Sequence, residues 1–209
     1  MHKRGMRIVL DSIFPPTVHG RLLREYTKER FARHLSPQPV GAVVSLSHYY
    51  KTPVQAAIAA CKFERSQHAA RLLATLCVAW LETNQTTGIT LLIPIPLSAK
   101  RQKERGFNQV TRVLHYVPTA KQLKIEERLL FRSLDTVRQT SLGRSDRLNN
   151  LKGAFIMSPT IATYDWAEIN RVIICDDVLT TGATLEAARA ELAPHLPAHV
   201  TLVLLAWAH

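Results

Sequence analysis

Three strand-length apolar runs constrain the fold of this chain more than any other feature. They are GITLLIPIP at 88–96, RVIICDD at 171–177 and HVTLVLLAW at 199–207. Such runs are typical of strands that are buried on both faces of a sheet. Between the last two lies the helix-like segment GATLEAARAELAPH, which prolines end. Buried strands that alternate with helices predict an α/β fold with a parallel-centred sheet flanked by helices.

The remaining segments predict further elements. Residues 53–82 open with Pro53 and carry apolar residues at the spacing of one helix face, so we expect helix there. We also expect a basic helix at 20–35, a strand at 40–50, a helix at 106–117, a strand at 127–133 and a short helix at 145–151.

Charge and length limit the class of protein. The 209 residues are enough for one sizeable core. A net charge of +11 and a pI near 10.0 favour anionic partners, which could be phosphate esters, nucleic acid or a membrane surface. No apolar run is long enough for a transmembrane helix, and Asp11 interrupts the apolar stretch near the start. The expected location is therefore the cytoplasm.

The cysteines predict no special chemistry. Cys61, Cys77 and Cys175 have no CxxC spacing, so the sequence predicts neither a disulfide framework nor a zinc site. Each lies in an apolar pattern, which favours burial as a small hydrophobic side chain.

Two adjacent acids, Asp176 and Asp177, end the second apolar run. Neighbouring carboxylates repel each other and are costly to desolvate, so a ligand is expected to stabilise them. In open α/β sheets, ligands bind just outside the carboxyl ends of the strands. The acid pair is therefore predicted to lie at a binding crevice.

The segment after the acids predicts a phosphate site. It leads directly into a helix, whose first N–H groups and dipole attract anions. Its hydroxyl groups add donors, and Gly182 lets the backbone approach a phosphate closely. The predicted phosphate loop consists of Thr180, Thr181, Gly182, Ala183 and Thr184. Acids that accept from two ribose hydroxyls, next to this loop, suit a sugar phosphate. The structural alternative, a turn with one capping threonine, needs neither three such residues nor an acid pair.

This stretch resembles the 5-phosphoribosyl-1-pyrophosphate (PRPP) motif of type I phosphoribosyltransferases. LLIPIPLSAKRQKERGFNQV at 91–110 and RQTSLGRSDRLNNLKGAF at 138–155 resemble the ComF family of competence-related phosphoribosyltransferase-like proteins, as do DSIFPP and HYYKTPVQAAIAACKF. The resemblance covers nearly the whole chain. It implies a type I phosphoribosyltransferase fold with a small N-terminal extension or hood at 1–52 and a phosphoribosyltransferase-like domain at 53–209. The family's four-cysteine zinc module has no counterpart here, since TVHGRLLREY carries no cysteine.

The resemblance also implies roles for individual residues. Asp176 and Asp177 would bind the ribose hydroxyls, and residues 180–184 the 5′-phosphate. The pyrophosphate-binding loop would comprise Leu97, Ser98, Ala99, Lys100 and Arg101, with Arg105 as a further phosphate contact. A mobile loop would supply Arg138, Gln139, Thr140 and Arg147, of which Arg138 and Arg147 act in catalysis with the two acids. Most of the net positive charge lies in residues 100–152, which agrees with a pyrophosphate site.

Two functions remain open. In the first, the protein transfers a phosphoribosyl group from PRPP to an unknown acceptor and releases pyrophosphate, with Mg²⁺ bound through PRPP and Asp176 and Asp177 as its candidate protein ligands. In the second, it is a non-catalytic competence or DNA-uptake protein that binds single-stranded DNA or a partner through its basic surface. Binding requires only residues 176–184, whereas catalysis also requires Arg138 and Arg147. Proteins of this fold often form homodimers, so a homodimer is one expectation; the acceptor is not readable from the sequence.

Overall fold

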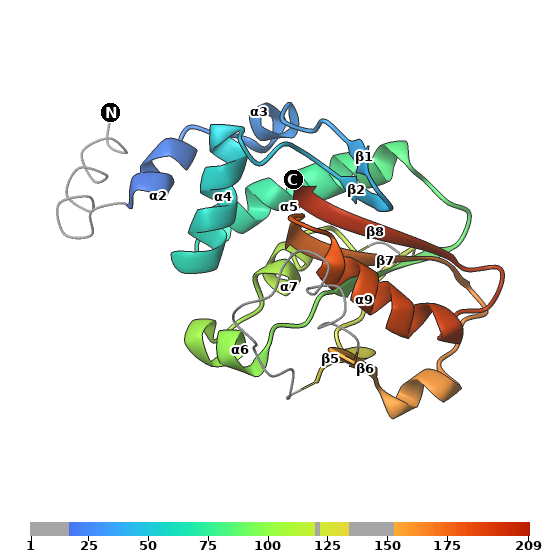
Figure 1. Ribbon diagram of the computed structural model, residues 1–209. Coiled ribbons are helices and arrows are strands. Elements are labelled where there is room, and N and C mark those ends of the chain that lie inside the picture. Colours follow the sequence, from blue (N-terminus) through green and yellow to red (C-terminus); the bar gives the residue numbers. More distant parts are fainter. Residues whose placement is uncertain (1–16, 120–121, 134–152) are drawn as a thin grey trace.

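The computed structural model describes residues 17–119, 122–133 and 153–209. Its centre is a six-stranded sheet, and Figure 1 shows β7 and β8 side by side within it. Every neighbouring pair is parallel except β1 with β2. The predicted α/β fold with a parallel-centred sheet is confirmed. The strands lie in the order β1 (Gln38–Val40), β2 (Val43–Ser45), β8 (Thr201–Ala208), β7 (Ile169–Val178), β3 (Ile89–Pro94) and β4 (Leu123–Ile125).

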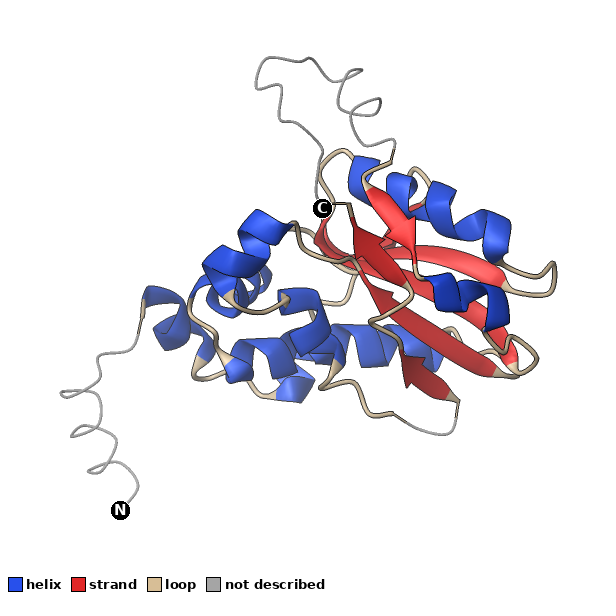
Figure 2. Ribbon diagram, turned by 90° about the horizontal axis from the view of Figure 1, so that it is seen from below, coloured by secondary structure: helices blue, strands red, loops and turns tan. Residues whose placement is uncertain are grey.

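Both faces of the sheet are covered, as the apolar runs predicted (Figure 2). Successive side chains of a strand point to opposite faces. In β7, Ile173 and Cys175 therefore pack in one apolar cluster, and Val172 and Ile174 in the other. The first cluster contains residues of α4 (Thr52–Phe63), α5 (Gln67–Thr83) and α7 (Gln109–Leu114), and the second contains residues of α9 (Ala183–Leu192) and of the small sheet β5 (Leu130–Arg132) and β6 (Phe155–Met157).

The connections of β3 and β7 create a crevice between these two neighbouring strands. The chain leaves β3 through α6 (Ala99–Arg105) and α7, then adds β4 on the outer side. It leaves β7 through α9 on the opposite face and adds β8 in the other direction. In such sheets, the point where the connections diverge is where ligands bind.

Several predicted elements differ from the observed ones. The helix expected at 20–35 is two short helices, α2 (Val18–Leu23) and α3 (Lys28–Ala32), because Thr27 accepts a hydrogen bond from the Arg30 amide and begins a new helix. The helix expected at 53–82 is interrupted after Phe63, where Arg65 adopts a φ of 53° and Ser66 caps α5.

The strand expected at 40–50 is shorter, but residues 38–45 of the expected N-terminal extension form two strands of the main sheet. The helix at 106–117 and the strand at 127–133 are confirmed in shorter form, as α7 and β5. Strand β4 was not predicted, and the helix at 145–151 lies outside the described residues. Within the described ranges, no helix has the length and apolar character needed to cross a membrane.

Candidate functional site

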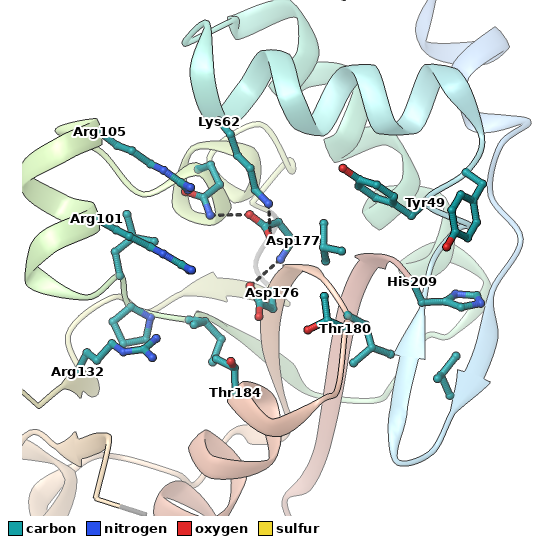
Figure 3. Close-up of a pocket in the computed structure, with 18 residues that line it drawn as sticks. Tyr49, Lys62, Arg101, Arg105, Arg132, Asp176, Asp177, Thr180, Thr184 and His209 are labelled. Carbon is teal, nitrogen blue, oxygen red and sulfur yellow. Dashed lines mark hydrogen bonds and ion pairs between the residues drawn. The ribbon is translucent and has the colours of Figure 1, made fainter. Parts of the chain in front are cut away.

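A cavity of about 700 Å³ lies at the carboxyl ends of four neighbouring strands. Tyr49 follows β2, His209 follows β8, Asp176 and Asp177 lie near the end of β7, and Ile95 follows β3. Figure 3 shows the two acids between a group of arginines on one side and Tyr49 with His209 on the other. The crevice predicted from the sequence is therefore lined by residues from both halves of the chain.

Both acids face this cavity, and protein donors already hold them. Asp176 Oδ1 accepts a hydrogen bond of 2.8 Å from the Asp177 amide. Asp177 Oδ2 accepts one of 2.5 Å from Gln109 Nε2, and its Oδ1 lies 3.0 Å from Lys62 Nζ. Desolvation, and then the charge of Asp177, raise the pKa of Asp176 from 3.8 to about 7, although the Asp177 amide, Lys62 and Arg101 partly oppose this. Both causes favour the protonated form of Asp176.

Three arginines form the basic side of the cavity: Arg101 and Arg105 from α6, and Arg132 from the end of β5 (Figure 3). Arg132 packs over the Phe155 ring, with its guanidinium carbon 5.2 Å from the ring centroid. Burial and the nearby Arg101 lower the pKa of Arg132, while Asp176 opposes that shift. Sequence reasoning did not single out Arg132, because it lies before the segment that resembles the mobile loop.

The opposite side of the cavity is aromatic. Tyr49 and His209 lie on it, and Tyr50 and Val40 are among the other lining residues of the cavity. The His48 and His209 rings lie 4.8 Å apart between centroids. His209 Nδ1 is buried without a hydrogen-bond partner among the residues that the structure describes. This side therefore combines ring faces with one unsatisfied polar atom.

The predicted phosphate loop divides into lining and supporting residues. Thr180 and Thr184 line the cavity. Thr181 Oγ1 instead accepts from the Ala183 amide at 3.4 Å, and Ala183 is buried. Gly182 has a φ of 76°, the left-handed region that favours glycine, and directly precedes α9. The turn itself therefore favours glycine, and the close phosphate approach expected from the sequence stays a prediction.

The predicted pyrophosphate loop divides in the same way. Leu97, Arg101 and Arg105 line the cavity. Ser98 caps α6, where its hydroxyl accepts from the Arg101 amide. Lys100 forms an exposed ion pair with Glu104 at 3.6 Å, and Ala99 is the first residue of α6. The expected mobile-loop residues Arg138, Gln139, Thr140 and Arg147 lie outside the described residues.

Two further site residues, Lys62 and Gln109, were missed. Lys62 lies at the end of α4 and Gln109 at the start of α7. Neither belongs to a motif for sugar-phosphate binding, although both lie in stretches that resemble the ComF family: Lys62 in HYYKTPVQAAIAACKF and Gln109 in GFNQV. The three cysteines are buried as predicted, and burial raises the pKa of Cys61 to about 11.

Comparisons with known proteins identify a relative. The chain is 28% identical over 176 residues to a protein named competence protein F from Haemophilus influenzae, an alignment that covers 82% of this chain and 76% of the relative. The chain is a relative of competence protein F. This match confirms the resemblance to the ComF family that the motifs indicated. No family model matches the chain.

Among solved structures, the chain is similar to a crystal structure of a hypoxanthine phosphoribosyltransferase from Staphylococcus aureus. The TM-score is 0.37 and the identity 14%, over 68% of this chain and 63% of that one. The alignment thus spans less than two thirds of that enzyme.

Proposed function

We propose that this relative of competence protein F binds PRPP, or a closely related sugar phosphate, and transfers its phosphoribosyl group to an acceptor with release of pyrophosphate. The observation that carries the proposal is the position of Asp176 and Asp177. They lie where the connections of β3 and β7 diverge, between the start of α9 and three arginines. For a ribose with phosphate groups at both ends, the cavity thus offers acceptors for the ribose hydroxyls and donors for the phosphate groups at each end.

Each part of the cavity would bind one part of this substrate. The carboxylates accept hydrogen bonds from the ribose hydroxyls, since each carboxylate oxygen has two lone pairs. Thr180, Thr184 and the first amides of α9 would hold the 5′-phosphate. Arg101, Arg105 and Arg132 would bind the pyrophosphate, and a guanidinium matches phosphate oxygens with two parallel donors.

The same arrangement favours departure of pyrophosphate. The bond between the anomeric carbon and the pyrophosphate oxygen breaks, and its electron pair leaves with that oxygen. Positive charge then develops on the ribose and negative charge on the leaving group. Arginines fixed near the leaving group stabilise its charge without reorganising, while the acid pair favours the cation. The incoming acceptor supplies the electron pair of the new bond.

A magnesium ion fits this cavity through its substrate. Among the described residues, no three His, Cys, Asp or Glu side chains cluster. Magnesium in such sites is commonly held by one or two carboxylates and by substrate phosphates, so Asp176 and Asp177 are its candidate protein ligands here. When bound, the ion would neutralise negative charge on the pyrophosphate.

A second candidate function, single-stranded DNA binding in competence, is favoured by one surface feature. Phe63 is 73% exposed, with the Arg105 guanidinium 5.6 Å from its ring centroid. Arg112 lies 3.9 Å, and Arg65 5.6 Å, from the Phe107 ring centroid. Aromatic faces next to cations suit stacked bases and a phosphate backbone. The name of the relative, competence protein F, agrees with such a role.

Calorimetric titration of PRPP with Mg²⁺ tests the first function. Wild type, the Asp176→Asn, Asp177→Asn double variant and a Glu82→Gln control are compared, since Glu82 is exposed on α5 away from this cavity. Binding to wild type and control that is lost in the double variant supports the proposal and justifies an acceptor screen for pyrophosphate release. If wild type binds no PRPP, the transferase proposal is wrong. Single-strand binding that weakens steeply with salt would then favour the second function.

A further inference from the structure

A chain of hydrogen bonds crosses the cavity from its basic side to the acid pair. Arg105 Nη1 donates to Gln109 Oε1 at 2.8 Å. Gln109 Nε2 in turn donates to Asp177 Oδ2 at 2.5 Å. Lys62 Nζ holds the other oxygen of Asp177 at 3.0 Å, and dashed lines in Figure 3 mark the contacts of Asp177. Arg105, proposed to bind pyrophosphate, is thus joined through the Gln109 amide to Asp177, proposed to bind ribose.

The side chain of Gln109 is fixed in one orientation. The residue is only 5% exposed. Its carboxamide has one acceptor end, which meets a guanidinium, and one donor end, which meets a carboxylate. Turning the amide over would place its NH₂ against Arg105 and its oxygen against Asp177, so that both hydrogen bonds are lost.

The backbone around Gln109 is fixed as well. Asn108 caps α7, because its side-chain oxygen accepts from the Val110 amide at 2.9 Å. The Asn108 side-chain nitrogen also donates to the Ile95 carbonyl at 2.8 Å, which ties the start of α7 to the end of β3. A buried, singly oriented amide on a fixed backbone transmits the position of one partner to the other.

We propose that Gln109 is a positioning residue that couples binding at the pyrophosphate end of the cavity to binding at the ribose end. The inference rests on the proposed function. Arg105 has further N–H donors for a phosphate besides the one given to Gln109. Pyrophosphate bound to Arg105 fixes that guanidinium, hence the Gln109 amide and, through it, the Asp177 carboxylate. Lys62 restrains Asp177 from a second helix, so that only small movements remain to be ordered.

The expected coupling is favourable and reciprocal. The first ligand removes the small movements that remain in these three side chains, so the second ligand no longer has to restrict them. Repulsion between two anionic ligands acts in the opposite direction, but it does not pass through Gln109. The contribution of Gln109 therefore appears as the difference between wild type and a Gln109 variant.

The test uses the two halves of the substrate as separate probes. The affinity for ribose 5-phosphate is measured by calorimetry with and without saturating pyrophosphate, at constant Mg²⁺, and the ratio of the two affinities is the coupling factor. Gln109→Leu removes both hydrogen bonds, and Gln109→Asn keeps an amide that is too short to span Arg105 and Asp177. Gln102→Leu, an exposed position on α6, is the matched control.

We expect the coupling factor to fall by about fivefold in both Gln109 variants and to be unchanged in the control. Ribose 5-phosphate alone should still bind each folded variant, which separates lost coupling from a lost site. Thermal unfolding checks the fold, and Gln109→Asn decides the matter if Gln109→Leu does not fold. An unchanged coupling factor in a folded Gln109 variant would overturn this proposal alone. If neither probe binds wild type, this proposal and the proposed function are both wrong.

Discussion

Replacing Asp176 with asparagine is expected to stabilise the ligand-free protein at neutral and alkaline pH. The pKa of this carboxyl is raised from 3.8 to about 7 in the folded protein, chiefly by desolvation and then by the charge of Asp177. The folded state therefore binds a proton more readily than the unfolded chain. Its stabilising effect is fully present below pH 3.8 and is lost as the pH rises through about 7.

The size of the effect follows from the shift. About three pKa units correspond to about 4 kcal/mol, which is an upper limit because the ionised carboxylate relaxes toward its donors. We expect about 2 kcal/mol in practice. Asparagine is neutral at every pH, and its side-chain oxygen can still accept from the Asp177 amide, a bond of 2.8 Å in wild type. The variant thus removes the charge and keeps that hydrogen bond.

The assay is denaturant unfolding of both proteins at about pH 5 and about pH 9, where the carboxyl is mostly protonated and mostly ionised. The variant should exceed wild type in free energy of unfolding at both pH values and by clearly less at the lower one, because at about pH 5 the unfolded chain has lost this proton while the folded protein still holds it. Asp165→Asn, an exposed acid, serves as control. Parallel pH profiles for wild type and Asp176→Asn, or a variant less stable at the higher pH, would refute the argument from desolvation. Residues that bind ligands are often less than optimal for stability, so a gain in free energy of unfolding at Asp176 would agree with a binding role.

Three further substitutions test other parts of the site. Lys62→Met should weaken PRPP binding about tenfold by leaving Asp177 without its ion pair, and Lys62→Arg should restore most of it, as measured by calorimetry. Gly182→Ala should lower the free energy of unfolding by about 1 kcal/mol because the φ of 76° is strained for alanine, and denaturant melts would check this. Arg132→Met should weaken pyrophosphate binding about tenfold and leave ribose 5-phosphate binding within about twofold, which separate calorimetric titrations of the two ligands would measure.

The acid pair and the loop after it could be predicted from the local sequence. Asp176 and Asp177 could be predicted because a buried strand, two acids and a helix start follow one another directly in the chain. Each feature constrains its neighbours through strand geometry and helix capping, which act over a few residues. The same reasoning explains why the three buried strands were confirmed almost in full.

The other site residues are brought together by contacts between segments distant in sequence, and the sequence alone does not predict these contacts. Gln109 meets Asp177 across 68 positions of sequence. Its neighbour Asn108 has the pattern of a helix cap, but nothing local indicates that the following amide faces a carboxylate. Tyr49 and His209 lie at one cavity wall only because β2 is adjacent to β8, and strand order depends on packing of the whole sheet. Residue type alone predicted neither.

The place of β8 in the sheet has a consequence for how the protein matures. This strand comes latest in sequence among the described strands, yet it lies between β2 and β7. The Leu46 amide donates to the Ala206 carbonyl and the Tyr49 amide to the His209 carbonyl. The position of Tyr49 at the cavity therefore depends on β8 and the residue that follows it. During synthesis, β2 must wait for β8 to emerge before it can join the parallel strands, and contacts so distant in sequence form slowly. A chain without β8 would contain the acid pair but lack the strand that holds Tyr49 at the cavity, so ligand recognition should be complete only when this strand has joined the sheet.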